Sequence, residues 1–234
     1  TLDINFSELL HNFSGDRHTK AIVLYIEGLK DGREFLKAAK KCKKPIIVFK
    51  VGKTEIGKKA AATHTASMAG EAKIYSGIFK QANIIEAKST DELFDLVKGF
   101  ALVKKPKTKK VVIVTNSGGP GTAAADSVSH PLTLHKNTVI DLTGSATSET
   151  FSHVLDSLKK IKASFLVIYV PTSIAEPGKI TKAIAEFTEG RTVLTSCMGG
   201  FLACHCGTII KTHCAANFDS PERAINVLKK LVQS

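Results

Sequence analysis

A histidine among small side chains is the feature of this sequence that first suggests chemistry. His64 lies in residues 60–70, a segment of alanine, threonine, serine, methionine and glycine that leaves space around the imidazole ring. A substrate or a phosphoryl group could reach that ring, and a neutral imidazole is nucleophilic near pH 7. A hydrogen-bonded structural histidine would give the same pattern, so the sequence leaves both interpretations open.

A carboxylate follows the first apolar run of the chain. Glu27 comes directly after the predicted strand at residues 21–26, and α/β sheets bind their ligands at the carboxyl ends of their strands. There, Glu27 could accept a hydrogen bond from an imidazole N–H, which would fix the tautomer and leave the other nitrogen nucleophilic. A solvent-exposed carboxylate at a strand end explains the pattern equally well.

A glycine-rich turn, Asn116-Ser-Gly-Gly-Pro-Gly121, lies between a predicted strand and a predicted helix. Backbone N–H groups at the start of a helix lack internal partners and lie at the positive end of its dipole, so such a turn can bind an anion. The turn has neither the lysine of a Walker A loop nor the glycine spacing of a dinucleotide fingerprint. Spacing does not distinguish this anion site from a turn that needs glycine for its backbone angles. The candidate phosphate-binding residues are Asn116, Ser117, Gly118, Gly119 and Gly121.

Cysteine and histidine residues crowd into residues 197–214 and suggest zinc as an alternative. The Cys204-His-Cys206 spacing lacks the two-residue gap of a zinc knuckle. Residues 202–210 also have a helical pattern, in which positions two apart face different sides. We therefore expect no metal site here and predict that most of these cysteines are small buried hydrophobic residues.

Four short apolar runs, each followed by a turn and a helical pattern, would position these residues. The runs cover residues 21–26, 111–114, 165–170 and 192–194. Such runs are typical of strands buried on both faces of a parallel sheet, and their alternation with helices is typical of βαβ units. Asp31, Ser89 and Ser220 provide helix start signals that agree with this pattern. The sequence predicts an α/β protein with parallel sheets.

A basic segment, residues 104–110, divides the chain. Its proline ends the preceding helix and its clustered lysines resist burial, so we interpret it as a linker between lobes at 1–103 and 111–234. The lysines within residues 40–44 come at a predicted helix end, where cations suit the helix dipole. Both clusters could instead bind nucleic acid.

The composition fits a globular protein with anionic partners. The 234 residues include 33 Lys and Arg against 21 Asp and Glu, a formal charge of +12. This balance favours phosphate-bearing metabolites, nucleic acid or anionic lipid, but the few aromatic residues near the lysines argue against a single-strand-binding surface. No apolar run is long enough to cross a bilayer, and five cysteines indicate free thiols in the reducing cytoplasm. Because the chain starts with Thr rather than Met, we expect it to be a segment of a longer protein.

Several longer motifs follow one another along the chain. They are Tyr25-Ile-Glu-Gly-Leu-Lys-Asp-Gly32, Val51-Gly-Lys-Thr-Glu55, Ala62-Thr-His-Thr-Ala-Ser-Met-Ala-Gly70, Val114-Thr-Asn-Ser-Gly-Gly-Pro-Gly121, Asp141-Leu-Thr-Gly-Ser-Ala-Thr147 and Ser220-Pro-Glu-Arg-Ala224. In wording and order these motifs resemble those of the NDP-forming acyl-CoA synthetases, the family of ADP-forming acetate–CoA ligase and succinyl-CoA synthetase. The resemblance covers nearly the whole chain and implies two flavodoxin-like lobes.

The resemblance also implies a chemistry with two exchanges: acyl phosphate and CoA exchange to give acyl-CoA and inorganic phosphate, and a phosphoryl group is relayed between acyl phosphate and ADP through a transient phosphohistidine. His64 matches the phosphorylated histidine, Glu27 the carboxylate that holds its imidazole, and residues 116–121 the helix start that stabilises the phosphohistidine. CoA, ADP or ATP, and Mg²⁺ would be substrates of the full enzyme, with no tightly bound cofactor and no membrane. The implied partners are a CoA-binding domain and an ATP-grasp domain or subunit, in an oligomer.

The sequence departs from the family pattern at several points. Ala66 replaces a glycine after the histidine, the stretch before Asp141 lacks a proline, and residues 126–137 are short enough to question one strand of the second lobe. These departures keep two alternatives open. One is a non-catalytic ligand-sensing domain, as in the same fold fused to protein acetyltransferases, and the other is a polyanion-binding module.

Overall fold

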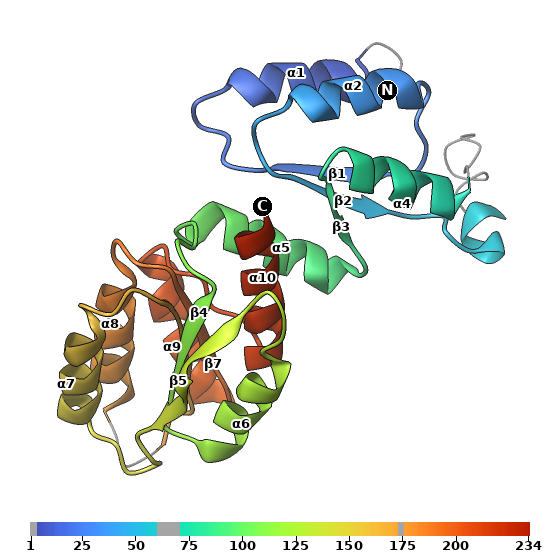
Figure 1. The fold of residues 1–234 in the computed structure, drawn as a ribbon. Coiled ribbons are helices and arrows are strands. Elements are labelled where there is room, and N and C mark those ends of the chain that lie inside the picture. The colour runs from blue at the N-terminus through green and yellow to red at the C-terminus, as the bar shows by residue number, and fades with distance from the viewer. Residues whose placement is uncertain (1–3, 60–70, 173–175) are drawn as a thin grey trace. The chain divides into compact units, whose positions relative to one another are not determined.

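Two parallel sheets confirm the α/β fold class that the apolar runs predict. The structure, a computed structural model, describes residues 4–59, 71–172 and 176–234 (Figure 1). It divides into unit 1, which ends at Val97, and unit 2, which runs from Lys98 to Gln233. This division falls within helix α5 (Thr90–Leu102), and the domain limits drawn from the sequence stay a prediction.

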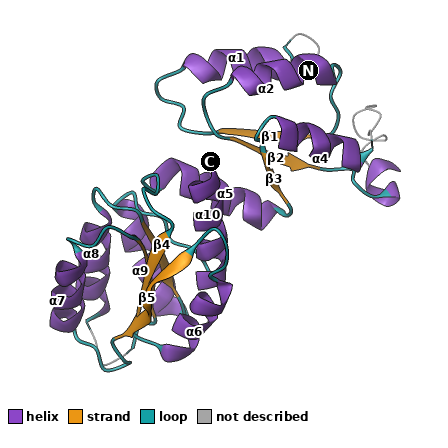
Figure 2. Cartoon of the chain, in the orientation of Figure 1, coloured by secondary structure: helices purple, strands orange, loops and turns teal. Residues whose placement is uncertain are grey.

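Unit 1 contains a three-stranded parallel sheet in the order β1-β2-β3. Its strands are β1 (Ile22–Ile26), β2 (Ile46–Lys50) and β3 (Ile85–Ala87). Its helices include α1 (Phe6–Gly15), α2 (Gly32–Lys41) and α4 (Ala72–Gln81). Alternate residues of β1, at positions 22, 24 and 26, share one apolar core with buried residues of α1, α2 and α4. One face of the sheet is therefore covered by these three helices (Figure 2).

Unit 2 contains a four-stranded parallel sheet in the order β5-β4-β6-β7. Its strands are β4 (Lys110–Thr115), β5 (Thr133–Asp141), β6 (Ser164–Tyr169) and β7 (Val193–Cys197). Its helices are α6 (Gly118–Ser127), α7 (Ser148–Leu158), α8 (Pro177–Thr188), α9 (Phe201–Thr212) and α10 (Pro221–Gln233). Helices α7, α8 and α9 share one core with the sheet, and buried residues of α10 form a separate apolar stripe.

The strand order of unit 2 reverses direction at β4. The chain passes from β4 to β5 on one side and then returns to β6 on the other side of β4. Loops that leave neighbouring strands in opposite directions open a crevice at the carboxyl ends of those strands, where open α/β sheets bind ligands. In unit 2 this switch point lies between the ends of β4 and β6.

The strand questioned by the short stretch 126–137 is present as β5. Its pairing with β4 runs from Val111↔Leu134 to Ile113↔Val139, so β5 contains extra residues at this point. Lys136 and Asn137 adopt φ values of 54° and 52° there. A bulge therefore accommodates polar residues that hide the strand from the sequence pattern.

The three helix start signals act as predicted. Asp31 accepts hydrogen bonds from the N–H groups of Arg33 and Glu34, both at 2.9 Å. The Ser89 hydroxyl accepts from the Glu92 N–H at 3.1 Å. The Ser220 hydroxyl accepts from the Arg223 N–H at 3.4 Å. These caps explain why α2, α5 and α10 begin where they do.

The basic segment at residues 104–110 is held against unit 2. The Lys104 ammonium donates to the Gly190 carbonyl at 2.9 Å, and the Thr192 hydroxyl donates to the Lys105 carbonyl at 3.4 Å.

Within the described parts of the chain, no helix is both long and apolar enough to span a bilayer.

The Asp31 cap provides a test of the fold of unit 1. Asp31→Ala should lower the free energy of unfolding by about 1 kcal/mol, because two N–H groups at the start of α2 lose their acceptor. Asp31→Asn keeps an acceptor oxygen and should remain close to wild type. Urea titration of both variants measures the difference, and equal losses in the two variants would contradict a capping role.

Candidate functional site

The predicted site residues lie in two units, each described by itself. Glu27 belongs to unit 1 and residues 116–121 belong to unit 2. His64 lies outside the described residues, as does the rest of the segment 60–70. The proposed role of His64 therefore depends on sequence, while the surroundings of the other candidates can be examined directly.

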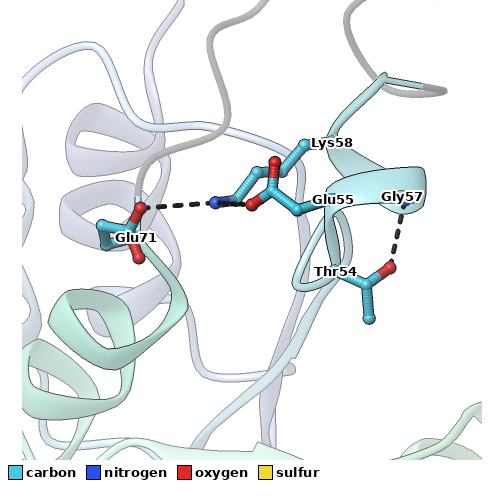
Figure 3. A network of polar contacts seen from close by, with 5 residues as sticks. All are labelled: Thr54, Glu55, Gly57, Lys58 and Glu71. Carbon is cyan, nitrogen blue, oxygen red and sulfur yellow. Dashed lines mark hydrogen bonds and ion pairs between the residues drawn. The ribbon is translucent and has the colours of Figure 1, made fainter.

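An ionic contact joins the two sides of the segment that contains His64. The Lys58 ammonium lies 2.8 Å from a carboxylate oxygen of Glu55 and 3.3 Å from one of Glu71, as Figure 3 shows. Thr54 begins the short helical turn at residues 55–59 by accepting from the Gly57 N–H at 3.1 Å. The two carboxylates raise the pKa of Lys58 through hydrogen bonds and charge. Lys58, which precedes residues 60–70, is thus in ionic contact with Glu71, which follows them.

Glu27 follows the last residue of β1, at the carboxyl end of the sheet, as predicted. The residue is half-buried, and its backbone carbonyl accepts a hydrogen bond from the Lys50 ammonium at 2.8 Å. Lys50 ends the neighbouring strand β2 and is 2% exposed. The interpretation of the sequence did not single out Lys50, although a lysine that closes the apolar run at residues 46–49 was a visible signal.

The glycine-rich turn lies at the carboxyl end of β4 and starts α6 at Gly118. The Ser117 side chain makes no capping hydrogen bond. Across the residues that the structure describes, the Gly118 and Gly119 N–H groups have no hydrogen-bond acceptor, and both glycines are exposed. Free N–H groups at the start of a helix are the element that an anion site requires.

Close packing explains two of the glycines independently of any ligand. A Cβ atom at Gly121 would lie 2.8 Å from Thr115 Cγ2, and one at Gly118 would lie 3.2 Å from a carboxylate oxygen of Asp141. A Cβ atom at Gly119 would meet nothing within 4 Å. The structural explanation therefore applies to Gly121 and Gly118, whereas packing does not require a glycine at Gly119.

The Asn116 side chain joins the two strands at the switch point of unit 2. Its amide N–H donates to the Val170 carbonyl and its amide oxygen accepts from the Val170 N–H, both at 2.8 Å. Asn116 is 3% exposed. The Ser117 N–H donates to the Thr115 hydroxyl at 3.0 Å. These bonds hold the turn rigidly between β4 and β6, and phosphate contacts of Asn116 and Ser117 stay a prediction.

The cysteines of residues 197–214 fall into two groups. Cys197 and Cys206 are buried, as predicted, whereas Cys204 and Cys214 are exposed, which corrects the prediction for those two. Cys197 ends the buried strand β7, Cys204 and Cys206 lie on opposite faces of α9, and Cys214 follows the end of that helix, which explains the difference. Burial raises the pKa of the Cys197 thiol to about 12. Over the described ranges, histidine, cysteine and acidic residues form no group of three that could hold a metal ion.

Native thiol labelling tests this division. In the folded protein, iodoacetamide should modify Cys204 and Cys214 at least about 100-fold faster than Cys197 and Cys206, because a buried thiol with a raised pKa forms little thiolate. Peptide mass spectrometry before and after unfolding measures each site. Rapid native labelling of Cys206 would contradict its buried position in α9.

Paired glycine substitutions test the packing of the turn. Gly121→Ala should lower the free energy of unfolding by about 1–3 kcal/mol, because the new methyl group overlaps Thr115. Gly119→Ala serves as the control and should leave stability within about 1 kcal/mol of wild type, since alanine favours a helix and meets no neighbour. Urea titration distinguishes the two, and equal stabilities would contradict the close approach of α6 to β4.

Comparisons with known proteins agree with the resemblance seen in the motifs. Residues 1–100 match the family described as succinyl-CoA ligase like flavodoxin domain. The chain is 34% identical, over 98% of its length and 55% of the relative, to the acetate–CoA ligase [ADP-forming] I subunit alpha of Pyrococcus furiosus. It is also similar to the acetate–CoA ligase [ADP-forming] of Methanocaldococcus jannaschii. There the identity is 54% over a stretch that covers 53% of this chain and 18% of that protein.

A solved structure has a similar fold. It is the dinucleotide forming acetyl-coenzyme A synthetase 1 of Ca. Korarchaeum cryptofilum, in complex with phosphate and ADP, with a TM-score of 0.84 and 29% identity over 97% of this chain and 56% of that one. The chain spans about half the length of this protein and of the alpha subunits that it matches. Similarity across both units, with the motifs in the same order, shows that the chain belongs to the NDP-forming acyl-CoA synthetase family.

Proposed function

We propose that this chain is the phosphoryl-relay segment of an ADP-forming acid–CoA ligase, and that His64 carries the phosphoryl group. The observation that supports this most is the placement of Glu27 and of the glycine-rich turn, each at the carboxyl end of its parallel sheet, in a chain similar to such ligases over 98% of its length. Parallel sheets bind ligands at that end.

In the proposed reaction, a nitrogen of His64 attacks the phosphorus of an acyl phosphate. The bond from phosphorus to the acyl oxygen breaks, and the carboxylate leaves. The other ring nitrogen keeps its proton, so the phosphorylated imidazole is a cation, and the Glu27 carboxylate stabilises it by accepting that N–H. Transfer to ADP then breaks the N–P bond, forms ATP and restores neutral imidazole.

The glycine-rich turn has the properties needed to bind the transferred group. The Gly118 and Gly119 N–H groups are exposed at the positive end of the α6 dipole, and the bonds of Asn116 to Val170 hold them in place. Catalysis of phosphoryl transfer depends mainly on positioning and electrostatic stabilisation. A rigid turn with free N–H groups supplies both.

The remaining parts of the reaction belong to other domains in this proposal. CoA, ADP or ATP and Mg²⁺ are substrates of the complete enzyme, and a CoA-binding domain and an ATP-grasp domain or subunit complete the site in an oligomer. We place the enzyme in the cytoplasm, in keeping with its free cysteines.

Radiolabelling tests the relay. The chain, assembled with its CoA-binding and ATP-grasp parts, is incubated with γ-labelled ATP and Mg²⁺. We expect an acid-labile, alkali-stable label that His64→Ala removes entirely. Glu27→Gln should slow its formation about 100-fold, because the amide no longer stabilises the cationic ring. His153→Ala, a change on α7, is the matched control and should label at the wild-type rate. An unlabelled wild-type assembly would refute the relay.

A further inference from the structure

A buried lysine lies next to the candidate carboxylate in unit 1. Lys50 occupies the last position of β2, where a fully apolar side chain would continue the run of residues 46–49, and it is 2% exposed. Burial lowers the pKa of this lysine, the nearby Lys53 lowers it further, and the Glu27 carboxylate opposes both effects. A buried ammonium is costly and adds little stability compared with an apolar side chain. Its presence therefore calls for a reason other than stability.

The Lys50 ammonium bonds to the backbone on both strands that end here. It donates to the Glu27 carbonyl at 2.8 Å and also to the Val51 carbonyl. It lies 4.7 Å from the centre of the Tyr75 ring, in a position for a cation–π contact. Lys50 thus connects the end of β1, the end of β2 and helix α4.

Tyr75 holds the other side of the same turn. Its hydroxyl accepts a hydrogen bond from the Leu29 N–H at 3.1 Å. The tyrosine is 8% exposed, and its ring packs against Phe79 with 6.0 Å between ring centres. One residue before the turn, the Ile26 carbonyl accepts from the Val51 N–H at 3.1 Å. The backbone before Glu27 is therefore held by a backbone bond to Val51, and the backbone after it is held by the side chains of Lys50 and Tyr75, which come from two different elements.

We propose that Lys50 and Tyr75 are positioning residues that hold the turn of residues 27–29, so that the Glu27 carboxylate keeps one orientation toward its imidazole partner. The inference rests on the proposed function, in which that partner is His64. A carboxylate that orients an imidazole must itself be held within a fraction of an ångström, and supporting hydrogen bonds are the usual means. Lys50 holds the Glu27 carbonyl, and Tyr75 holds the N–H two residues later.

Tyr75→Phe provides the cleanest test, because it removes only the hydroxyl and keeps the ring that packs against Phe79 and Lys50. We expect the rate of His64 labelling in the assembled enzyme to fall about tenfold, since small displacements of a catalytic group are costly. Tyr25→Phe is the matched control: Tyr25 lies on β1 and is 55% exposed, and its loss of a hydroxyl should leave the rate unchanged. Lys50→Met should cost more than Tyr75→Phe, because both carbonyls lose their donor.

A double-mutant cycle distinguishes positioning from general support of the fold. If Tyr75 acts through Glu27, Tyr75→Phe should slow labelling in the wild-type background and have no further effect in Glu27→Gln. A hydroxyl that only supports the fold would cause the same loss in both backgrounds, and that result would overturn the proposal. An unchanged rate in Tyr75→Phe would overturn it as well.

Amide exchange supplies a readout that does not depend on activity. Hydrogen–deuterium exchange of the Leu29 N–H should become at least about tenfold faster in Tyr75→Phe and stay unchanged in Tyr25→Phe, because only the first variant loses the acceptor. Unchanged exchange in Tyr75→Phe would refute the hold on the turn even if His64 is labelled normally. Faster exchange with no labelling of the wild-type enzyme would instead refute the relay, and with it the purpose proposed for this hold.

Discussion

Backbone groups that leave a buried sheet must still find hydrogen-bond partners, and this constraint governs the carboxyl ends of both sheets. Beyond the last ladder bond, the strands separate and their N–H and carbonyl groups lose their neighbours. In unit 2 the Asn116 side chain spans the gap to Val170 with two bonds of 2.8 Å. In unit 1 the Lys50 ammonium bonds to the carbonyls of Glu27 and Val51. Both side chains are almost fully buried.

The two solutions differ in a way that affects chemistry. An amide both donates and accepts, so Asn116 pairs with both the N–H and the carbonyl of Val170 and adds no charge to the switch point. An ammonium only donates, so Lys50 pairs with two carbonyls and leaves a positive charge beside the Glu27 carboxylate, as the opposing effect of Glu27 on the pKa of Lys50 indicates. The first arrangement holds a turn with free N–H groups, and the second holds a turn with a carboxylate.

Among the described strands, the apolar pattern located β1, β4, β6 and β7 but not β2, β3 or β5. The four predicted runs overlap β1, β4, β6 and β7 in turn. Strand β3 has only three residues, and β5 contains a bulge with polar residues, so neither produces a strong pattern. Strand β2, with the apolar residues 46–49 before Lys50, was not among the predicted runs, although its residues are mostly buried. The caps at Asp31, Ser89 and Ser220 were visible because a capping side chain acts within three residues of its own position.

The sequence by itself determined the α/β class, the helix starts, the family and the identity of the candidate residues, since each of these depends on local pattern or on residues in a fixed order. The tertiary structure decided what those residues contact. It showed that the amide of Asn116 bonds to Val170, that Cys204 and Cys214 are exposed, and that Lys50 and Tyr75 enclose the turn at Glu27. These hydrogen bonds join residues 23 to 54 positions apart, and only the packing of strands and helices brings those positions together.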